Sequence, residues 1–266
     1  VAMLMSCKES PDTSKVAQER SNLSGASYFN EFIACKTGPE YSPELMNAMI
    51  SEWRNLIDPS ALVGGWIYLP ASSTNTYPEG AWWELQWDSD VTARDAWATW
   101  INDEQVSEWT EKYANVFNCD GQNRNSFEGV FPIDAQEFGE FPDSGYFYSE
   151  VLLCNYENGA SSDEAKAFLE GYTRAVRASN YGGTGYHFGN YFASNNPDAD
   201  FLWGEFTNSA ESYAKVTELF AQDVEPVQFP LFSQFASCRE NADKYNGWTA
   251  FDRSELNSKA DFSVMN

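Results

Sequence analysis

The sequence is poor in basic residues and in histidine. It has 16 Lys and Arg against 40 Asp and Glu, a formal net charge of −24, and His187 is its single histidine. Nucleic acids and anionic lipid surfaces attract basic proteins, so we expect neither of them as a partner. The acidic residues are spread along the chain rather than gathered in a tail, which is typical of a solvated, self-repelling surface.

The common motifs of catalytic and metal sites are also missing from the sequence. It contains no GxSxG, no HExxH, no CxxC and no Gly-rich phosphate loop that opens a helix. No apolar run approaches the roughly 18 residues of a membrane-spanning helix. We therefore expect no metal site, no cofactor and no membrane span.

Aromatic residues, in contrast, are abundant. Phe, Trp and Tyr make up 16% of the chain. Such side chains either fill a hydrophobic core or line a surface on which a ligand stacks, and the composition leaves both interpretations open.

The cysteines indicate an internal duplication. Cys35 and Cys119 are 84 residues apart, Cys154 and Cys238 are also 84 apart, and the second pair follows the first by 119 residues. Four cysteines thus form two equivalent pairs and leave Cys7 over. Two disulfides, one per copy, would fit an oxidising compartment, whereas four buried free thiols are the alternative.

The N-terminal residues resemble a bacterial lipoprotein signal. Leu4-Met5-Ser6-Cys7 has the pattern of a lipobox, in which the cysteine receives the lipid, and a polar stretch follows it. Residues 1–27 are therefore interpreted as a residual signal and polar tether, with a plain N-terminal segment as the alternative. This interpretation predicts an extracytoplasmic lipoprotein, periplasmic or on the outer surface of a bacterium, attached peripherally to the membrane through a lipid on Cys7.

The remaining chain divides into two units of like element order. We predict units at 28–133 and 146–255, an acidic linker at 134–145 and a tail at 256–266. The first unit has predicted strands at 29–35, 62–69, 82–87 and 126–133, and predicted helices after Ser42, at 90–102 and at 106–117. The second repeats this order, so each unit is β-α-β-β-α-β, the ferredoxin-like arrangement.

Two such units in one chain resemble the dimeric α+β barrel superfamily. The resemblance covers most of residues 28–255 and implies an α+β fold in which two sheets face each other around a ligand cavity. The two units of one chain would take the place of the two subunits, so the protein is expected to be a monomer with pseudo-twofold symmetry. It carries no catalytic motif, so it implies fold rather than activity. The chlorite dismutase group of that superfamily holds its haem on a histidine, but the position of His187 on a predicted second strand does not match that ligand.

Strand alternation gives a candidate cavity lining. An offset of 119 matches the apolar face of Trp83, Leu85 and Trp87 with Leu202, Gly204 and Phe206, and we expect that face to pack on helices. The opposite, mixed faces predict a ligand-binding lining of Glu31, Trp66, Tyr68, Trp82, Glu84, Glu150, His187, Trp203 and Glu205.

Three of these positions are candidates for chemistry. His187 is either a general base or a merely hydrogen-bonded side chain. Glu84 and Glu205 are either a carboxylate pair for acid–base work or solvated strand residues.

Three functions remain compatible with the sequence. The first is an extracytoplasmic protein that binds a small apolar or aromatic ligand in the barrel. The second is a cofactor-independent monooxygenase or isomerase, and the third is a structural or partner-binding surface protein. These functions can be distinguished by whether the barrel interior holds an open cavity and by which side chains line it.

Overall fold

The computed structural model describes residues 26–196, 198–256 and 260–265, so Cys7 and the predicted tether up to residue 25 lie outside the described residues, while residues 26 and 27 already belong to the first strand. The elements of the first unit are β1 (Ala26–Thr37), α2 (Pro43–Leu56), β2 (Leu62–Pro70), β3 (Ala81–Trp87), α3 (Asp90–Trp100), α4 (Glu104–Tyr113) and β4 (Phe117–Phe131). Those of the second are β5 (Tyr146–Tyr156), α5 (Ser162–Ala178), β6 (His187–Ala193), β7 (Phe201–Thr207), α6 (Ala210–Leu219), the π-helix η1 (Phe220–Val224), α7 (Glu225–Phe232), β8 (Ala236–Cys238) and β9 (Asp243–Asp252).

The strands close into a barrel of eight. Their order is β7-β6-β4-β1-β3-β2-β9-β5, and β5 pairs back with β7, while β8 continues the edge of β9 along β5. Each unit contributes the ferredoxin-like sheet order, β4-β1-β3-β2 and β9-β5-β7-β6, and the β4–β6 and β2–β9 ladders join the two sheets. The predicted tandem α+β barrel is confirmed.

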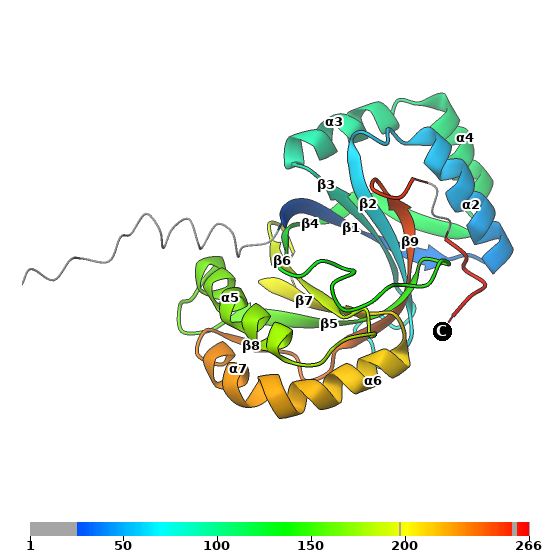
Figure 1. Ribbon diagram of the computed structural model, residues 1–266. Coiled ribbons are helices and arrows are strands. Elements are labelled where there is room, and N and C mark those ends of the chain that lie inside the picture. The colour runs from blue at the N-terminus through cyan, green and yellow to red at the C-terminus, as the bar shows by residue number, and fades with distance from the viewer. Residues whose placement is uncertain (1–25, 197, 257–259, 266) are drawn as a thin grey trace, which may run out of the picture.

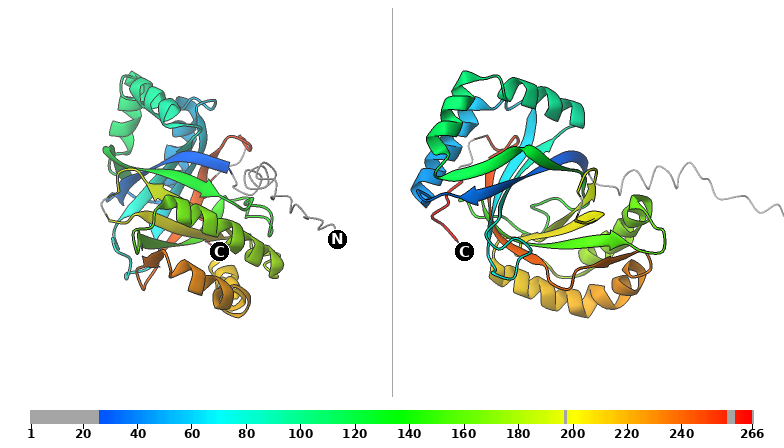
Figure 2. Two further views of the ribbon diagram at one scale, coloured as in Figure 1. Left: turned by 90° about the vertical axis from the view of Figure 1, so that its left-hand side faces the viewer. Right: turned by 180° about the vertical axis from the view of Figure 1, so that it is seen from behind.

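The helices cover the outer faces of the barrel. Helices α2, α3 and α4 lie over the first sheet and α5, α6 and α7 over the second, on opposite sides of the molecule (Figures 1 and 2). Two hydrophobic cores lie between the helices and the sheets, and a third, largely aromatic one lies inside the barrel. None of the helices among the described residues is long and apolar enough to cross a bilayer.

The helix starts follow from local sequence. The Ser42 side chain accepts a hydrogen bond from the Leu45 amide, and Pro43 occupies the first turn, where its missing N–H leaves nothing unsatisfied. In the second unit Ser161 and Glu164 form a capping box.

Several boundaries differ from the prediction by a few residues, and two differ by more. Strand β4 begins at Phe117, nine residues before the expected 126, because its first residues pair with the end of β1 at Cys35–Cys119. The second helix of the second unit, which the repeated pattern predicts at 209–222, continues through η1 into α7, where Pro226 occupies the first turn and Pro230 lies inside the helix.

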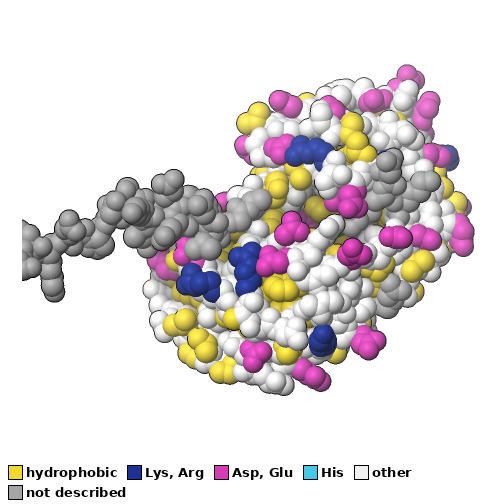
Figure 3. Space-filling model, viewed as in Figure 1, with side chains coloured by type: hydrophobic (Ala, Val, Ile, Leu, Met, Phe, Trp, Pro, Cys, Tyr) yellow, Lys and Arg dark blue, Asp and Glu magenta, His cyan; other side chains and the backbone are white. Residues whose placement is uncertain are grey.

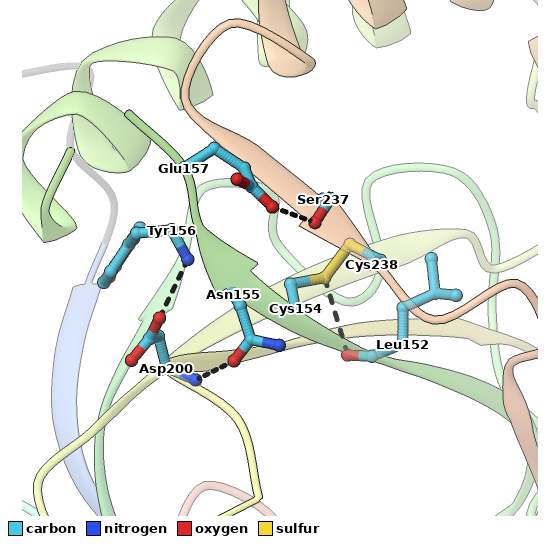
Figure 4. Close-up of a disulfide and its surroundings, with 8 residues drawn as sticks. All are labelled: Leu152, Cys154, Asn155, Tyr156, Glu157, Asp200, Ser237 and Cys238. Atoms are coloured by element: carbon cyan, nitrogen blue, oxygen red, sulfur yellow. Dashed lines mark hydrogen bonds between the residues drawn. A yellow bond between two sulfur atoms is a disulfide. The ribbon is translucent and has the colours of Figure 1, made fainter. Parts of the chain in front are cut away.

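Both predicted disulfides are present. Cys35–Cys119 joins β1 to β4, and Cys154–Cys238 joins β5 to β8 at the equivalent place. Figure 4 shows the second bridge, beside which Ser237 Oγ donates to Glu157 at 2.6 Å. Two such bridges are typical of an oxidising, extracytoplasmic compartment.

The two copies are not related by one constant offset. Glu31 on β1 pairs with Leu85, whereas Glu150, 119 residues later, pairs with Glu205, which is 120 residues after Leu85. The second copy therefore has one additional residue before its third strand. As a result, the counterpart of Glu84 is Gly204 and the counterpart of Trp83 is Trp203.

Replacing both cysteines of either bridge by serine should destabilise the protein. Each bridge spans 84 residues, and closing a loop of that length removes enough unfolded-state entropy to contribute about 4 kcal/mol. We expect the free energy of unfolding in urea to fall by about that amount for each pair. Alkylation of the unreduced protein should label no cysteine except Cys7, and labelling of four more thiols would contradict the assignment.

Candidate functional site

A buried carboxyl group lies at the centre of the barrel. Glu84, on β3, is 1% exposed. Asn30 Nδ2 donates to Glu84 Oε1 at 2.6 Å, and the Tyr68 hydroxyl donates to Oε2 at 2.5 Å. The Tyr191 hydroxyl approaches Oε2 at 3.5 Å from the second unit. Four strands (β1, β2, β3 and β6) thus meet at one carboxyl group.

The two tyrosines are pseudo-symmetric, whereas the carboxyl group is not. Tyr68 pairs with Trp82, two residues before Glu84, and Tyr191 pairs with Leu202, two residues before Gly204. A Cβ added to Gly204 would lie 3.0 Å from Phe206 and 3.2 Å from Tyr191, so this side of the barrel has no room for a second carboxyl group. One carboxyl group therefore serves both tyrosines.

Burial tunes the acidity of this group. Desolvation raises the pKa of Glu84 to about 7, although the hydrogen bonds from Tyr68, Asn30 and Tyr191 favour the charged form and oppose the rise. Burial and the neighbouring carboxyl group hold the pKa of Tyr68 and of Tyr191 well above the ordinary value, so both remain protonated donors. Glu84 can therefore take up or release a proton near neutral pH.

Glu84 lies at the floor of a cavity of about 1330 Å³ at one mouth of the barrel. The walls come from the strands and carry aromatic rings, including Trp66, Phe147 and Phe206. The predicted linker, residues 134–145, contributes much of the rim. Among the described residues, no group of three or more His, Cys, Asp or Glu side chains is arranged to hold a metal ion.

His187 borders the same cavity, as the alternation predicted. Its ring stacks on Phe206 at a centroid distance of 4.8 Å and meets the edge of Phe141 at 5.5 Å, while Nδ1 lies 3.4 Å from the Gly185 carbonyl oxygen. Desolvation lowers the pKa of His187 to about 4, so the imidazole is neutral at physiological pH. Its catalytic role stays a prediction.

Trp203 and Glu205 face the helices instead of the barrel. Glu205 accepts hydrogen bonds from Tyr186 at 2.9 Å and Tyr213 at 2.8 Å, and Trp203 stacks on Phe188. The prediction was wrong here because one extra residue moves every side chain of a strand to the opposite face. Glu84 and Glu205 therefore cannot act as a pair, and Phe206, expected on the helix side, lies inside the barrel.

Glu31 and Glu150 also lie on the outer face. Glu31 Oε2 accepts from the Trp97 indole at 2.6 Å, and Oε1 accepts from Arg124 at 2.9 Å. Glu150 accepts from the Tyr148 hydroxyl and forms an ion pair with Lys244, both at 3.0 Å. The partners of both carboxylates lie on the outer face of the barrel, so neither carboxylate faces the cavity.

The remaining predicted lining residues face the interior, at both ends of the barrel. Trp66 and Tyr68 border the mouth cavity, and Trp82 borders a smaller pocket of about 70 Å³ at the opposite end. Sequence reasoning missed Asn30 and Tyr191. Asn30 precedes the glutamate that drew attention on β1, and the uniform offset matched Tyr68 with His187 instead of Tyr191.

Comparison with known proteins gives likeness in structure only. No protein-family model matches the sequence, and no curated protein matches it significantly. Chlorite dismutase from Candidatus Nitrospira defluvii in complex with imidazole aligns with a TM-score of 0.48 and 11% identity, covering 91% of this chain and 97% of that one. An anthrone oxidase-like protein aligns with a TM-score of 0.48 and 9% identity, covering 85% and 94%. At these values neither neighbour's activity transfers to this chain.

The raised pKa of Glu84 should make stability depend on pH. The folded state holds this proton more tightly than the unfolded chain, whose glutamate has a pKa near 4.5, so the free energy of unfolding falls as the pH rises from 4.5 through 7. The shift corresponds to about 3 kcal/mol. Since Glu84→Gln cannot titrate, we expect its stability relative to the wild type to rise by about that amount between pH 4 and pH 8 in urea titrations. Parallel pH profiles of the two proteins would contradict the assignment.

Proposed function

We propose that this protein binds a small aromatic molecule in the mouth cavity of the barrel, with Glu84 as its polar anchor. The observation that carries the proposal is a single buried carboxyl group at the floor of a large cavity walled by aromatic rings. A carboxylate has about four acceptor positions, and the described residues donate to it three times, so it can still accept from a ligand.

The charge of the cavity lining limits the class of ligand that can bind. The described residues that line the cavity include Asp134, Glu140, Asp143, Asp252 and Glu255 but no Lys or Arg. Acidic side chains are also scattered over the face of the molecule in Figure 3, with few basic ones among them. Such a field repels anions and attracts cations. An aromatic amine satisfies both requirements, because its ring meets the aromatic walls and its ammonium group meets Glu84.

Catalysis by the same carboxyl group is the second candidate. A general acid–base group works best when its pKa is near the working pH, and that of Glu84 is about 7. This supports a cofactor-independent monooxygenase or isomerase in which Glu84, rather than His187, moves the proton. The structural or partner-binding alternative has less support, because the interior is not closed and filled.

The compartment is part of the proposal. The two disulfides support an extracytoplasmic location. We propose that Cys7, outside the described residues, carries the lipid of a bacterial lipoprotein. Metabolic labelling with an alkyne fatty acid in a bacterial host should modify the wild type and leave Cys7→Ser unlabelled.

Binding can be tested with 1-naphthylmethylamine as probe and 1-ethylnaphthalene as the matched compound without the amine. We expect calorimetric titration at pH 8 to show that the amine binds at least tenfold more tightly than the hydrocarbon. Glu84→Gln should remove this preference, and lowering the pH to 5.5 should weaken binding of the amine to the wild type only, since Glu84 is then protonated. Equal affinity of the wild type and Glu84→Gln for the amine would contradict the proposal.

If the protein is an enzyme, the variants Glu84→Gln and His187→Ala should differ in activity. For any substrate that is turned over, we expect Glu84→Gln to lower kcat by 10²-fold or more and the wild-type profile to have an inflection near pH 7. His187→Ala should retain most activity, because its neutral imidazole is a weak base. Loss of turnover in His187→Ala with full activity in Glu84→Gln would reverse the assignment.

A further inference from the structure

A second cavity lies on the other face of β3, between the first sheet and its helices. Its volume is about 630 Å³. Indole rings form much of its wall, contributed by Trp53, Trp83, Trp87, Trp97, Trp100 and Trp109. Because alternate residues of β3 face opposite ways, Trp83 and Trp87 border this cavity while Glu84 and Gln86 border the mouth of the barrel.

Helix α3 forms part of the cavity wall, through residues that include Ala96 and Trp97. Ala93 is the one residue of α3 that is buried, whereas Val91, before it, is 50% exposed. The equivalent helix of the second unit, α6, also buries a single residue, Val216, but there the space beside the sheet is filled by rings such as Phe168, Tyr172 and Phe232 around Trp203. The two units therefore differ where their sheets meet their helices.

The side chain of Trp83 indicates that a hydrogen-bond acceptor is missing from this cavity. Its side chain is 5% exposed, and its indole Nε1 is buried without a hydrogen-bond partner among the described residues. The indoles of Trp87, Trp97 and Trp109 all have acceptors. Buried N–H groups are rarely left unpaired, because each loses its hydrogen bonds to water without compensation.

The equivalent tryptophan of the second unit shows why the Trp83 indole has no acceptor. Trp203 occupies the equivalent position, and while burial raises the pKa of the neighbouring Glu205 carboxyl group, the Trp203 indole favours its charged form and opposes that rise. The residue of the first unit that corresponds to Glu205 is Leu85, which has no acceptor. The first unit thus lacks the acceptor and also leaves a space beside the indole.

We propose that this cavity, on the helix side of the first sheet, is a second ligand site that takes an uncharged polycyclic or similarly flat apolar molecule carrying a carbonyl or ether oxygen. The indole walls supply apolar and stacking surface, and the ligand oxygen accepts from Trp83 Nε1. Asp58, Asp95 and Asp103 are among the cavity residues, and their charges disfavour an anionic ligand. The site is separate from the mouth cavity and does not depend on the function proposed for Glu84.

The test uses 9-fluorenone and fluorene, which share a skeleton and differ in the carbonyl oxygen. In ¹⁵N-labelled protein, Trp83→Phe identifies the Trp83 indole N–H signal by its loss, and Trp203→Phe identifies that of its matched counterpart. We expect fluorenone to shift the Trp83 signal downfield and to leave the Trp203 signal in place. Fluorenone should bind about tenfold more tightly than fluorene, the contribution of one hydrogen bond, and Trp83→Phe should abolish that difference.

A second variant fills the site without touching the donor. Ala96 on α3 borders the cavity, so Ala96→Phe should weaken both probes at least tenfold while the Trp83 signal remains. An unmoved Trp83 signal at saturating fluorenone, equal affinities for the two probes, or undiminished binding by Ala96→Phe would each overturn the proposal. Glu84→Gln should bind fluorenone as the wild type does, so failure of the barrel site and failure of this one are distinguishable.

Discussion

Closure of the barrel is the constraint on which the other features depend. A single ferredoxin-like unit would leave β2 and β4 with unpaired edges, and exposed edges invite aggregation. The β2–β9 and β4–β6 ladders pair each of these edges with a strand of the other unit. The same ladders bring the two interior faces together, so that Tyr191 of the second unit reaches the carboxyl group of Glu84 in the first. The central site is therefore a joint product of both units, and neither one contains it alone.

Strand β3 serves two environments at once. Its inward residues place a carboxyl group and an amide among tyrosines, and its outward residues place indoles beneath the helices. The second unit uses the equivalent strand differently, because Gly204 is inward and Glu205 is outward, where three tyrosine hydroxyls donate to it. Both cavities consequently break the pseudo-twofold symmetry. The duplication supplied the scaffold, and single-residue differences between the copies define the candidate sites.

Much of the fold could be predicted from the sequence, because its signals are local or repeated. The cysteine spacing gave both disulfides, Ser42 and Ser161 marked helix starts, and the order of elements gave the barrel. The faces of the strands were predicted less well. The second copy has four more residues before its second strand and three fewer between its second and third strands, since Tyr191 follows Tyr68 by 123 residues and Leu202 follows Trp82 by 120. A uniform offset of 119 then placed Trp203 and Glu205 on the wrong side. The convergence of Asn30, Tyr68 and Tyr191 on Glu84 depends on four separate strands and leaves no local signal.

The small pocket and the mouth cavity share part of their walls. Tyr68, Tyr191 and Phe206 border both spaces, so these rings form a partition across the barrel. The barrel interior is therefore divided into two spaces by part of its own aromatic core. Phe32 packs on both Tyr68 and Tyr191, so replacing one of the three rings by a smaller side chain would enlarge the neighbouring space and leave other rings of the core in place. The size of these three side chains thus sets how far a molecule that enters from either end can reach into the barrel.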